Sequence, residues 1–203
     1  GCLAEKHVAN SKAPQFNFSG AERAALELFA TTDRSSLSRH VPTEFAERQT
    51  RALNCTECHE KIENIPRFDI LGGKLKPEWS AKFIAGEISY KPRPWLEAQM
   101  PSFPKRAQLL AEGLAMQHGF SPQTSDEPPI DEKAAEIGRN LVSIPPLGFS
   151  CVACHAVGKV GITQVFESPG INLAHSGERL LPAFFNRWLL SPQLIDQIGR
   201  AHV

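Results

Sequence analysis

Two five-residue stretches carry most of the structural information in this 203-residue sequence: Cys55-Thr56-Glu57-Cys58-His59 and Cys151-Val152-Ala153-Cys154-His155. Both have the pattern C-x-x-C-H, and the second begins 96 residues after the first. Cysteines three positions apart lie on one face of a helix, and here a histidine follows them directly. Such cysteine pairs occur in covalent haem attachment, in structural zinc sites and in thioredoxin-type redox centres.

Haem attachment accounts for every residue of the pattern. Two thiols one helical turn apart can add to the two vinyl groups of a haem, and the adjacent histidine then lies under the iron as its proximal ligand. The sequence therefore predicts two covalently bound haem c groups. Their site residues are Cys55, Cys58 and His59 for the first group, and Cys151, Cys154 and His155 for the second.

The two other uses of cysteine pairs lack their usual sequence context here. A zinc ribbon separates its two pairs by about 15–20 residues, whereas 92 residues lie between Cys58 and Cys151. A thioredoxin-type pair follows a β-strand, and alternating β-branched runs that would predict a strand are scarce. We therefore favour haem over zinc and over a dithiol centre.

The sixth ligand of the first iron has an obvious candidate in Met100. It lies in the loop Gln99-Met100-Pro101-Ser102-Phe103-Pro104, which begins 40 residues after His59 and is stiffened by two prolines. A thioether opposite a histidine favours ferrous iron, which suits an electron carrier. Met116 is expected to pack in the core instead. The carbonyl of Pro66 is a candidate acceptor for the Nδ1–H of His59, which would fix the ring tautomer.

The second iron has no methionine partner, because none follows Cys154. Met100 lies 23 residues after Pro77, and the same offset from Pro182 falls at position 205, past the last residue. We therefore expect the equivalent loop, and the helix that closes the second unit, to lie outside this sequence. The alternative ligands for this iron are His175 and His202.

The last six residues have a second possible origin. The string Ile-Gly-Arg-Ala-His-Val at 198–203 is also what ATC GGA AGA GCA CAC GTC encodes, a common sequencing-adapter oligonucleotide. We therefore expect the natural sequence to differ after about Gln197.

Short helices joined by long loops are predicted along the chain. The 16 prolines and 14 glycines favour loops, and three of these prolines mark residues 121–130 as a boundary. A capping box at Ser19 and Glu22 opens a helix at about 20–30. Further helices are predicted over about 43–53 and 105–118. One helix is predicted to begin at Pro77 with Trp79 and Phe83 facing the core, and another at Pro182 with Phe184, Phe185 and Trp188 facing the core. A helix capped by Asp131 is predicted to have Ala134, Ile137 and Leu141 on one face. The order of helix, cysteine pair, loop and proline-led helix occurs twice, which indicates an internal duplication.

Charge and hydropathy exclude two classes of partner. The 22 lysines and arginines balance 22 aspartates and glutamates, so no sequence-independent attraction to nucleic acid is expected. No run approaches the roughly 18 apolar residues that a membrane span needs. The hydrophobic fraction of 41% supports a globular chain.

A helix ending in C-x-x-C-H, a middle helix, a Met-Pro loop and a closing helix together resemble class I cytochrome c. The phrases Pro-Glu-Trp, Arg-Pro-Trp-Leu and Met-Pro-Ser-Phe further resemble cytochrome domains of extracytoplasmic proteins from planctomycete-like bacteria. The resemblance implies an all-α fold of two tandem class I cytochrome c-like domains, the second lacking its closing helix. The implied parts are the end of a preceding unit with a linker (1–36), a first domain (37–120), a linker (121–130) and a truncated second domain (131–203).

The implied function is electron transfer through the two haem c groups, and not enzymatic catalysis. Two alternatives stay open: a dihaem peroxidase-like enzyme, which needs an iron with an open position, and the cytochrome segment of a larger dehydrogenase. The expected partners are redox proteins or a fused dehydrogenase domain. Because haem c is attached outside the cytoplasm, the expected location is periplasmic or extracytoplasmic.

Overall fold

Helices dominate the part of the chain that the structure, a computed structural model, describes. The described residues are Asn10, Lys12, Pro14, 16–33, Ser35, 41–63, 65–125, Glu127, 129–164 and 169–195. Helices make up more than half of them, and the strand-like pairs among them are two isolated bridges. The predicted all-α class is confirmed. The expectations for His202 and for residues 198–203 lie outside the described residues.

The chain divides into two compact units, residues 1–40 and 41–203. In the first unit, helix α1 (Gly20–Thr31) has the predicted capping box. The Ser19 hydroxyl accepts from the backbone N–H of Glu22, and the Glu22 carboxylate accepts from the backbone N–H of Ser19 at 2.8 Å. No residue of α1 is buried, so this helix contributes no core of its own.

The second unit begins with residues 41–120, which we call the first half. Its helices are α2 (Pro42–Ala52), α3 (Cys55–His59), α4 (Leu71–Lys74), α5 (Pro77–Ala85) and α6 (Ala107–Gln117), with a 3-10 turn, η2 (Phe68–Ile70), before α4. The predicted helices over 43–53, from Pro77 and over 105–118 are confirmed within a few residues at their ends. The rings of Trp79 and Phe83 stack with their centroids 5.0 Å apart.

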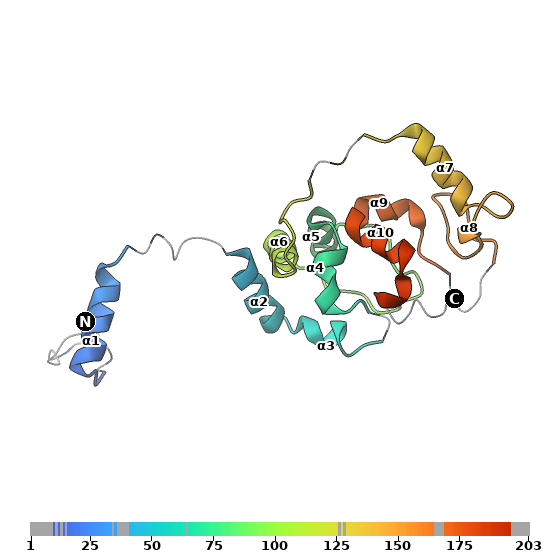
Figure 1. The fold of residues 1–203 in the computed structure, drawn as a ribbon. Helices are drawn as coiled ribbons and strands as arrows, with labels where there is room; N and C mark the ends of the chain where they lie inside the picture. The colour runs from blue at the N-terminus through green and yellow to red at the C-terminus, as the bar shows by residue number, and fades with distance from the viewer. Residues whose placement is uncertain are drawn as a thin grey trace. The chain divides into compact units, whose positions relative to one another are not determined.

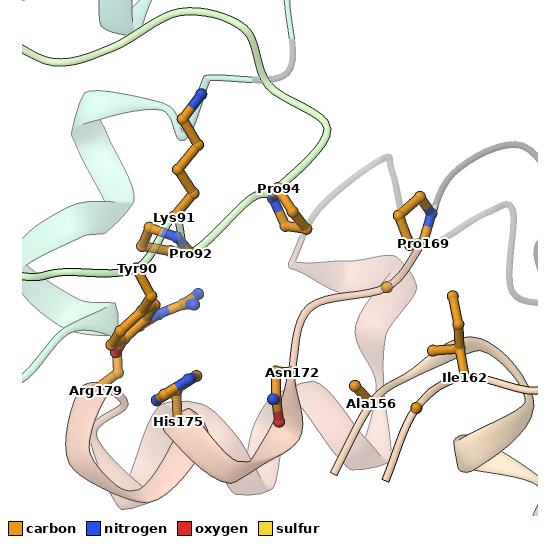
Figure 2. A pocket seen from close by; sticks show the side chains of 12 residues that line it. Tyr90, Lys91, Pro92, Pro94, Ala156, Ile162, Pro169, Asn172, His175 and Arg179 are labelled. Carbon is orange, nitrogen blue, oxygen red and sulfur yellow. The ribbon is translucent and has the colours of Figure 1, made fainter. Parts of the chain in front are cut away.

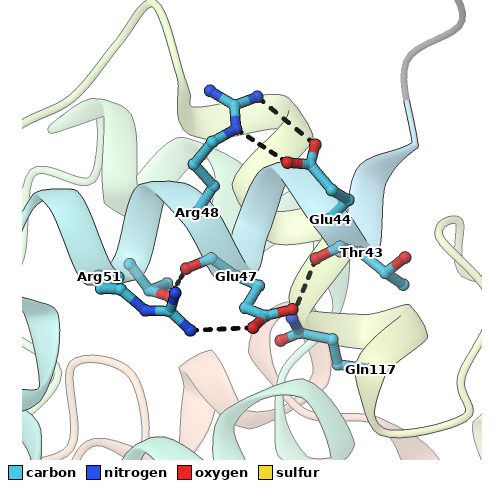
Figure 3. A network of polar contacts seen from close by, with 7 residues as sticks. Thr43, Glu44, Glu47, Arg48, Arg51 and Gln117 are labelled. Atoms are coloured by element: carbon cyan, nitrogen blue, oxygen red, sulfur yellow. Dashed lines mark hydrogen bonds and ion pairs between the residues drawn. The ribbon is translucent and has the colours of Figure 1, made fainter. Parts of the chain in front are cut away.

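The core of the first half lies where α2 and α5 pack on α6. Ala46 on α2 is fully buried, and it faces Gly113, where an added Cβ would lie 2.5 Å from the Ala46 Cβ and overlap the Pro42 carbonyl. The backbones of α2 and α6 therefore approach closely. Figure 3 shows the opposite, polar face of α2, where Glu44 pairs with Arg48 at 2.9 Å. The remaining members of the core cluster are Ala81, Ile84, Ala107, Leu110 and Ala111.

Residues 129–195 form what we call the second half. Its elements are α7 (Glu132–Val142), α8 (Cys151–Cys154), η3 (Leu173–His175), α9 (Ser176–Arg179), α10 (Pro182–Leu190) and η4 (Pro192–Leu194). The predicted cap of α7 is confirmed, because the Asp131 carboxylate accepts from the backbone N–H groups of Lys133 and Ala134.

The two halves have the same succession of elements after their cysteine motifs. Each has a three-residue 3-10 turn, a four-residue helix, one bridge residue and a nine-residue helix that begins with proline. The spacing is not constant, however: the motifs are 96 residues apart, whereas Pro77 and Pro182 are 105 residues apart. The second half has a longer loop between its histidine and the 3-10 turn. Within that loop, Val157 and Val160 form a tight turn.

The halves meet along a short antiparallel seam, formed by residues 74–76 and 179–181. The backbone N–H of Lys76 donates to the Arg179 carbonyl at 2.9 Å, and that of Leu181 donates to the Lys74 carbonyl at 3.0 Å. Lys74 and Arg179 are equivalent, because each is the last residue of a four-residue helix, and Lys76 and Leu181 each lie two residues further on. Each half therefore donates one equivalent hydrogen bond to the other, as at a two-fold interface. Figure 1 shows α4 and α10 next to each other at this seam.

Cation–aromatic contacts cross the seam in both directions. The Lys74 ammonium lies 5.1 Å from the centroid of the Phe184 ring, and the Arg179 guanidinium carbon lies 5.6 Å from that of Trp79. Trp79 and Phe184 are both the third residue of a proline-led helix. Such contacts stabilise by about 2 kcal/mol when desolvated, and both cations are only 7% exposed.

Several apolar side chains expected inside are exposed. Phe185 and Met116 are each 38% exposed, so the prediction that they pack in a core is wrong. Phe185 follows Phe184 directly on α10, and neighbouring helical positions point in different directions. On α7, Ile137 and Leu141 are 59% and 43% exposed, because no described element covers that face.

None of the helices in the described ranges is long and apolar enough to cross a bilayer.

Candidate functional site

A left-handed residue precedes each cysteine motif. Asn54 has φ 53° and Ser150 has φ 62°, and each is followed at once by the first cysteine. Non-glycine residues adopt this region rarely, asparagine more often than most, and at a cost of roughly 1–3 kcal/mol. The same conformation at equivalent positions indicates that both motifs need the same entry geometry.

The motif cysteines lie on one-turn helices at the molecular surface. Cys58 is exposed, whereas Cys55, Cys151 and Cys154 are half-buried, and all four are free thiols. Burial raises the pKa of the Cys55 thiol above its ordinary value. Each pair therefore offers two thiols to a reagent approaching from one side of its helix.

Both motif histidines are oriented by a backbone carbonyl. The Nδ1 of His59 lies 2.8 Å from the carbonyl oxygen of Pro66, as the sequence predicted, and that of His155 lies 2.9 Å from the carbonyl oxygen of Ile171. A carbonyl can only accept, so Nδ1 carries the proton in each ring. The lone pair is then on Nε2, which is the arrangement found in metal-binding histidines with an ordered second partner.

Close packing also fixes the ring of His155. A Cβ added at Gly170 would overlap His155 Nδ1 and lie 2.6 Å from its Cε1 atom. Only glycine leaves room for the imidazole at this place. In the first half the ring of His59 instead meets Phe68 edge-on, with the centroids 5.8 Å apart.

A cavity of about 440 Å³ opens beside the second motif. Its lining includes Ala156, which follows His155 directly, and Gly170, which packs on the His155 ring. We call it the seam cavity, because Tyr90 and Pro94 of the first half also line it (Figure 2). The motif residues fit a haem in two respects, with two thiols on one turn and an oriented imidazole. The cavity begins at the next residue, Ala156.

Met100 packs against the first core. Its side chain is half-buried and touches the cluster formed by α2, α5 and α6. It lies in the loop between α5 and α6, where Phe103 N–H donates to the Ile84 carbonyl at 2.7 Å. Its role as the sixth ligand of the first iron stays a prediction.

His175 takes part in a network that the sequence did not indicate. Its Nδ1 lies 2.9 Å from Glu178 Oε1, and its ring stacks on that of Tyr90 with centroids 3.7 Å apart. The Tyr90 hydroxyl accepts from Trp79 Nε1–H at 3.0 Å and donates to Glu178 at 2.5 Å. Burial, followed by this bond to Glu178, raises the pKa of Tyr90 to about 12.

The two cysteine motifs do not come together as ligands of one ion. Among the described residues, which include both motifs, no three His, Cys, Asp or Glu side chains are grouped so that they could hold a metal ion.

No family model matches this sequence, and comparisons with curated proteins and with solved structures find no similar chain.

Proposed function

We propose that the chain is a dihaem c-type cytochrome of class I that transfers electrons between redox partners. The observation that carries this proposal is the shared geometry of the two C-x-x-C-H motifs. Each has a left-handed residue before it and a histidine whose Nδ1 donates to a backbone carbonyl. Haem c bound at these motifs would supply a one-electron ferric–ferrous couple.

The chain's own residues would hold and orient each group. In each half the cysteine pair would tether the group, and the Nε2 atoms of His59 and His155 would ligate its iron. The carbonyls of Pro66 and Ile171 keep each imidazole in the tautomer that a metal requires. Met100 is the proposed sixth ligand at the first motif.

We further propose that the two halves are tandem cytochrome domains and that the second lacks its closing helix. The support is the contrast between α2 and α7, the helices that precede the two motifs. Ala46 of α2 is fully buried under α6, whereas no residue of α7 is buried in the described structure. A closing helix on Ile137 and Leu141 would complete the second domain as α6 completes the first.

The expected partners are redox proteins or a fused dehydrogenase domain, and the expected compartment is periplasmic or extracytoplasmic. Both expectations rest on the haem c proposal, since that group is attached outside the cytoplasm.

A spectroelectrochemical titration of the chain, matured with a cytochrome c maturation system, tests the proposed function. We expect two reversible one-electron transitions. Because the second iron has no methionine ligand in this sequence, slow consumption of hydrogen peroxide is compatible with electron transfer. Rapid catalytic turnover of peroxide with a reduced donor would establish the peroxidase-like alternative in its place.

A further inference from the structure

The seam cavity has one polar wall and one apolar wall. Figure 2 shows Tyr90, His175 and Arg179 on one side, and Pro94, Ile162 and Pro169 on the other. Its volume, about 440 Å³, lies in the range of roughly 300–1,000 Å³ that small-molecule sites occupy. None of its described lining residues is acidic. The cavity therefore offers positive charge at one end and apolar surface at the other.

Arg179 is a buried cation with no counter-charge among the described residues. It is only 7% exposed, its Nε has no hydrogen-bond partner among the described residues, and no ion pair joins it to a carboxylate there. The neighbouring carboxylate of Glu178 is bound by Tyr90 and His175 instead. Burial, together with the positive charge of Arg93, lowers the pKa of Arg179 to about 10. This pKa is still well above neutral pH, so Arg179 is protonated there.

A buried charge without an ion pair is costly even where it lies over an aromatic ring, as Arg179 lies over Trp79, because the ring offsets only part of the lost hydration. The guanidinium is turned toward the cavity, which Tyr90 also lines (Figure 2). The Asn172 side chain bonds the backbone of Gly158. Lys91 is also a cation of the lining, but its side chain is exposed to solvent and donates to the Leu96 carbonyl at 3.2 Å. Arg179 is therefore the buried cation of this cavity that an anion would neutralise.

We propose that the seam cavity binds an amphiphilic carboxylate, with the carboxylate on Arg179 and the apolar body against Pro94, Ile162 and Pro169. A guanidinium matches a carboxylate with two parallel N–H donors. The carboxylate has two possible sources: a propionate of the haem attached at Cys151 and Cys154, which rests on the proposed function, or a free small carboxylate, which does not.

The first arm of the test uses sodium hexanoate and the full chain expressed without haem maturation. Calorimetry should detect binding of hexanoate and no binding of hexanol, which lacks the charge. Arg179→Leu should weaken hexanoate binding by about ten-fold or more. The matched control, Arg187→Leu, removes an equal charge from an exposed site on α10 and should leave binding unchanged.

The second arm uses the matured protein and measures the reduction potential of each haem against pH. Arg179→Leu should lower the potential of the second haem, because a positive charge beside it is lost. The potential should also become pH-dependent near neutrality, because a buried propionate without a counter-charge takes up a proton. Arg187→Leu should shift neither haem.

The outcomes separate the two sources and the two proposals. Hexanoate binding to the haem-free chain but not to the matured protein identifies the propionate, whereas binding to both identifies a free carboxylate. If the maturation system attaches no haem, the proposed function is refuted, and the hexanoate measurement alone decides whether the cavity binds a carboxylate. Haem attachment with no hexanoate binding and no effect of Arg179→Leu overturns the carboxylate site alone. If circular dichroism shows that Arg179→Leu does not fold, Arg179→Lys replaces it, and it should weaken hexanoate less because it keeps the charge.

Discussion

The two halves of the second unit share their motif geometry but differ in how the helix before the motif is covered. In the first half, α2 crosses α6 so closely that Gly113 has no room for a side chain beside Ala46. In the second half, α7 has the same place before its motif, yet Ile137 and Leu141 on its apolar face are exposed. The left-handed residue and the bonded histidine are nevertheless present in both. The motif geometry therefore depends on local sequence, whereas the core around it depends on distant helices.

The largest expected effect concerns this difference in helix packing. Gly113→Ala adds a Cβ that overlaps the Pro42 carbonyl, and we expect it to destabilise the fold by about 3 kcal/mol. The matched change in α7, Gly138→Ala, meets nothing within 4 Å and should stabilise by about 0.5 kcal/mol, since alanine favours a helix. Denaturant unfolding followed by circular dichroism measures both. Similar losses from both changes would show that α7 is covered as α2 is.

The second prediction separates the two histidine environments. Gly170→Ala should displace the His155 ring, because the new Cβ would overlap Nδ1. In the matured protein the absorption and paramagnetic resonance signals of the second haem should change, whereas those of the first haem should not. The control, Gly177→Ala, adds a Cβ in open space and should alter neither signal. Unchanged signals in Gly170→Ala would mean that His155 is not a ligand.

A change at Met100 sharpens the comparison of the irons. Met100→Ala should leave both haems attached, lower the potential of the first and abolish the weak near-infrared charge-transfer band of an iron–thioether bond. The exposed Met116 provides the control, and Met116→Ala should preserve that band. Survival of the band in Met100→Ala would assign the sixth position to another residue.

The smallest effect lies at the seam, where Tyr90 joins the halves through Glu178. Tyr90 is the single tyrosine of the chain, so the ultraviolet absorbance of phenolate reports its titration alone. We expect a pKa of about 12 in the folded chain, a downward shift in Glu178→Gln, and none in the exposed Glu136→Gln. Since the pKa of Tyr90 is raised on folding, its contribution to stability is lost as pH rises from about 10 to 12.

Arg179 has the opposite effect on stability over the same pH range. Burial lowers its pKa to about 10, so the free-energy cost of burying its charge falls as the pH rises. The net slope of stability against pH should therefore be small there. Titration of Tyr90 near its ordinary value in the folded chain would mean that the bond to Glu178 does not form in solution.

Local signals predicted much of what the structure contains. The capping groups of Ser19 and Asp131, the helices that begin at Pro77 and Pro182, and the carbonyl of Pro66 were all indicated by short sequence patterns. Each of these features is decided by residues a few positions apart, which is why a sequence can reveal it.

The features that sequence reasoning missed depend on contacts between distant segments. The pairing of Lys76 with Arg179 joins residues more than a hundred positions apart, and nothing in either local sequence indicates it. The exposure of Phe185 and Met116 likewise depends on which helices cover α10 and α6. A signal for the seam was nevertheless present. Lys74 and Arg179 occupy equivalent places before the proline-led helices, so an alignment of the two halves would have singled them out.

Intact mass of the matured chain tests the central claim most directly. We expect an increment of two haems for the unchanged sequence. The double change Cys55→Ala with Cys58→Ala should remove one haem, and the double change Cys151→Ala with Cys154→Ala should remove the other. An unchanged chain that gains no haem, or that gains one haem which both double variants retain, would contradict the account.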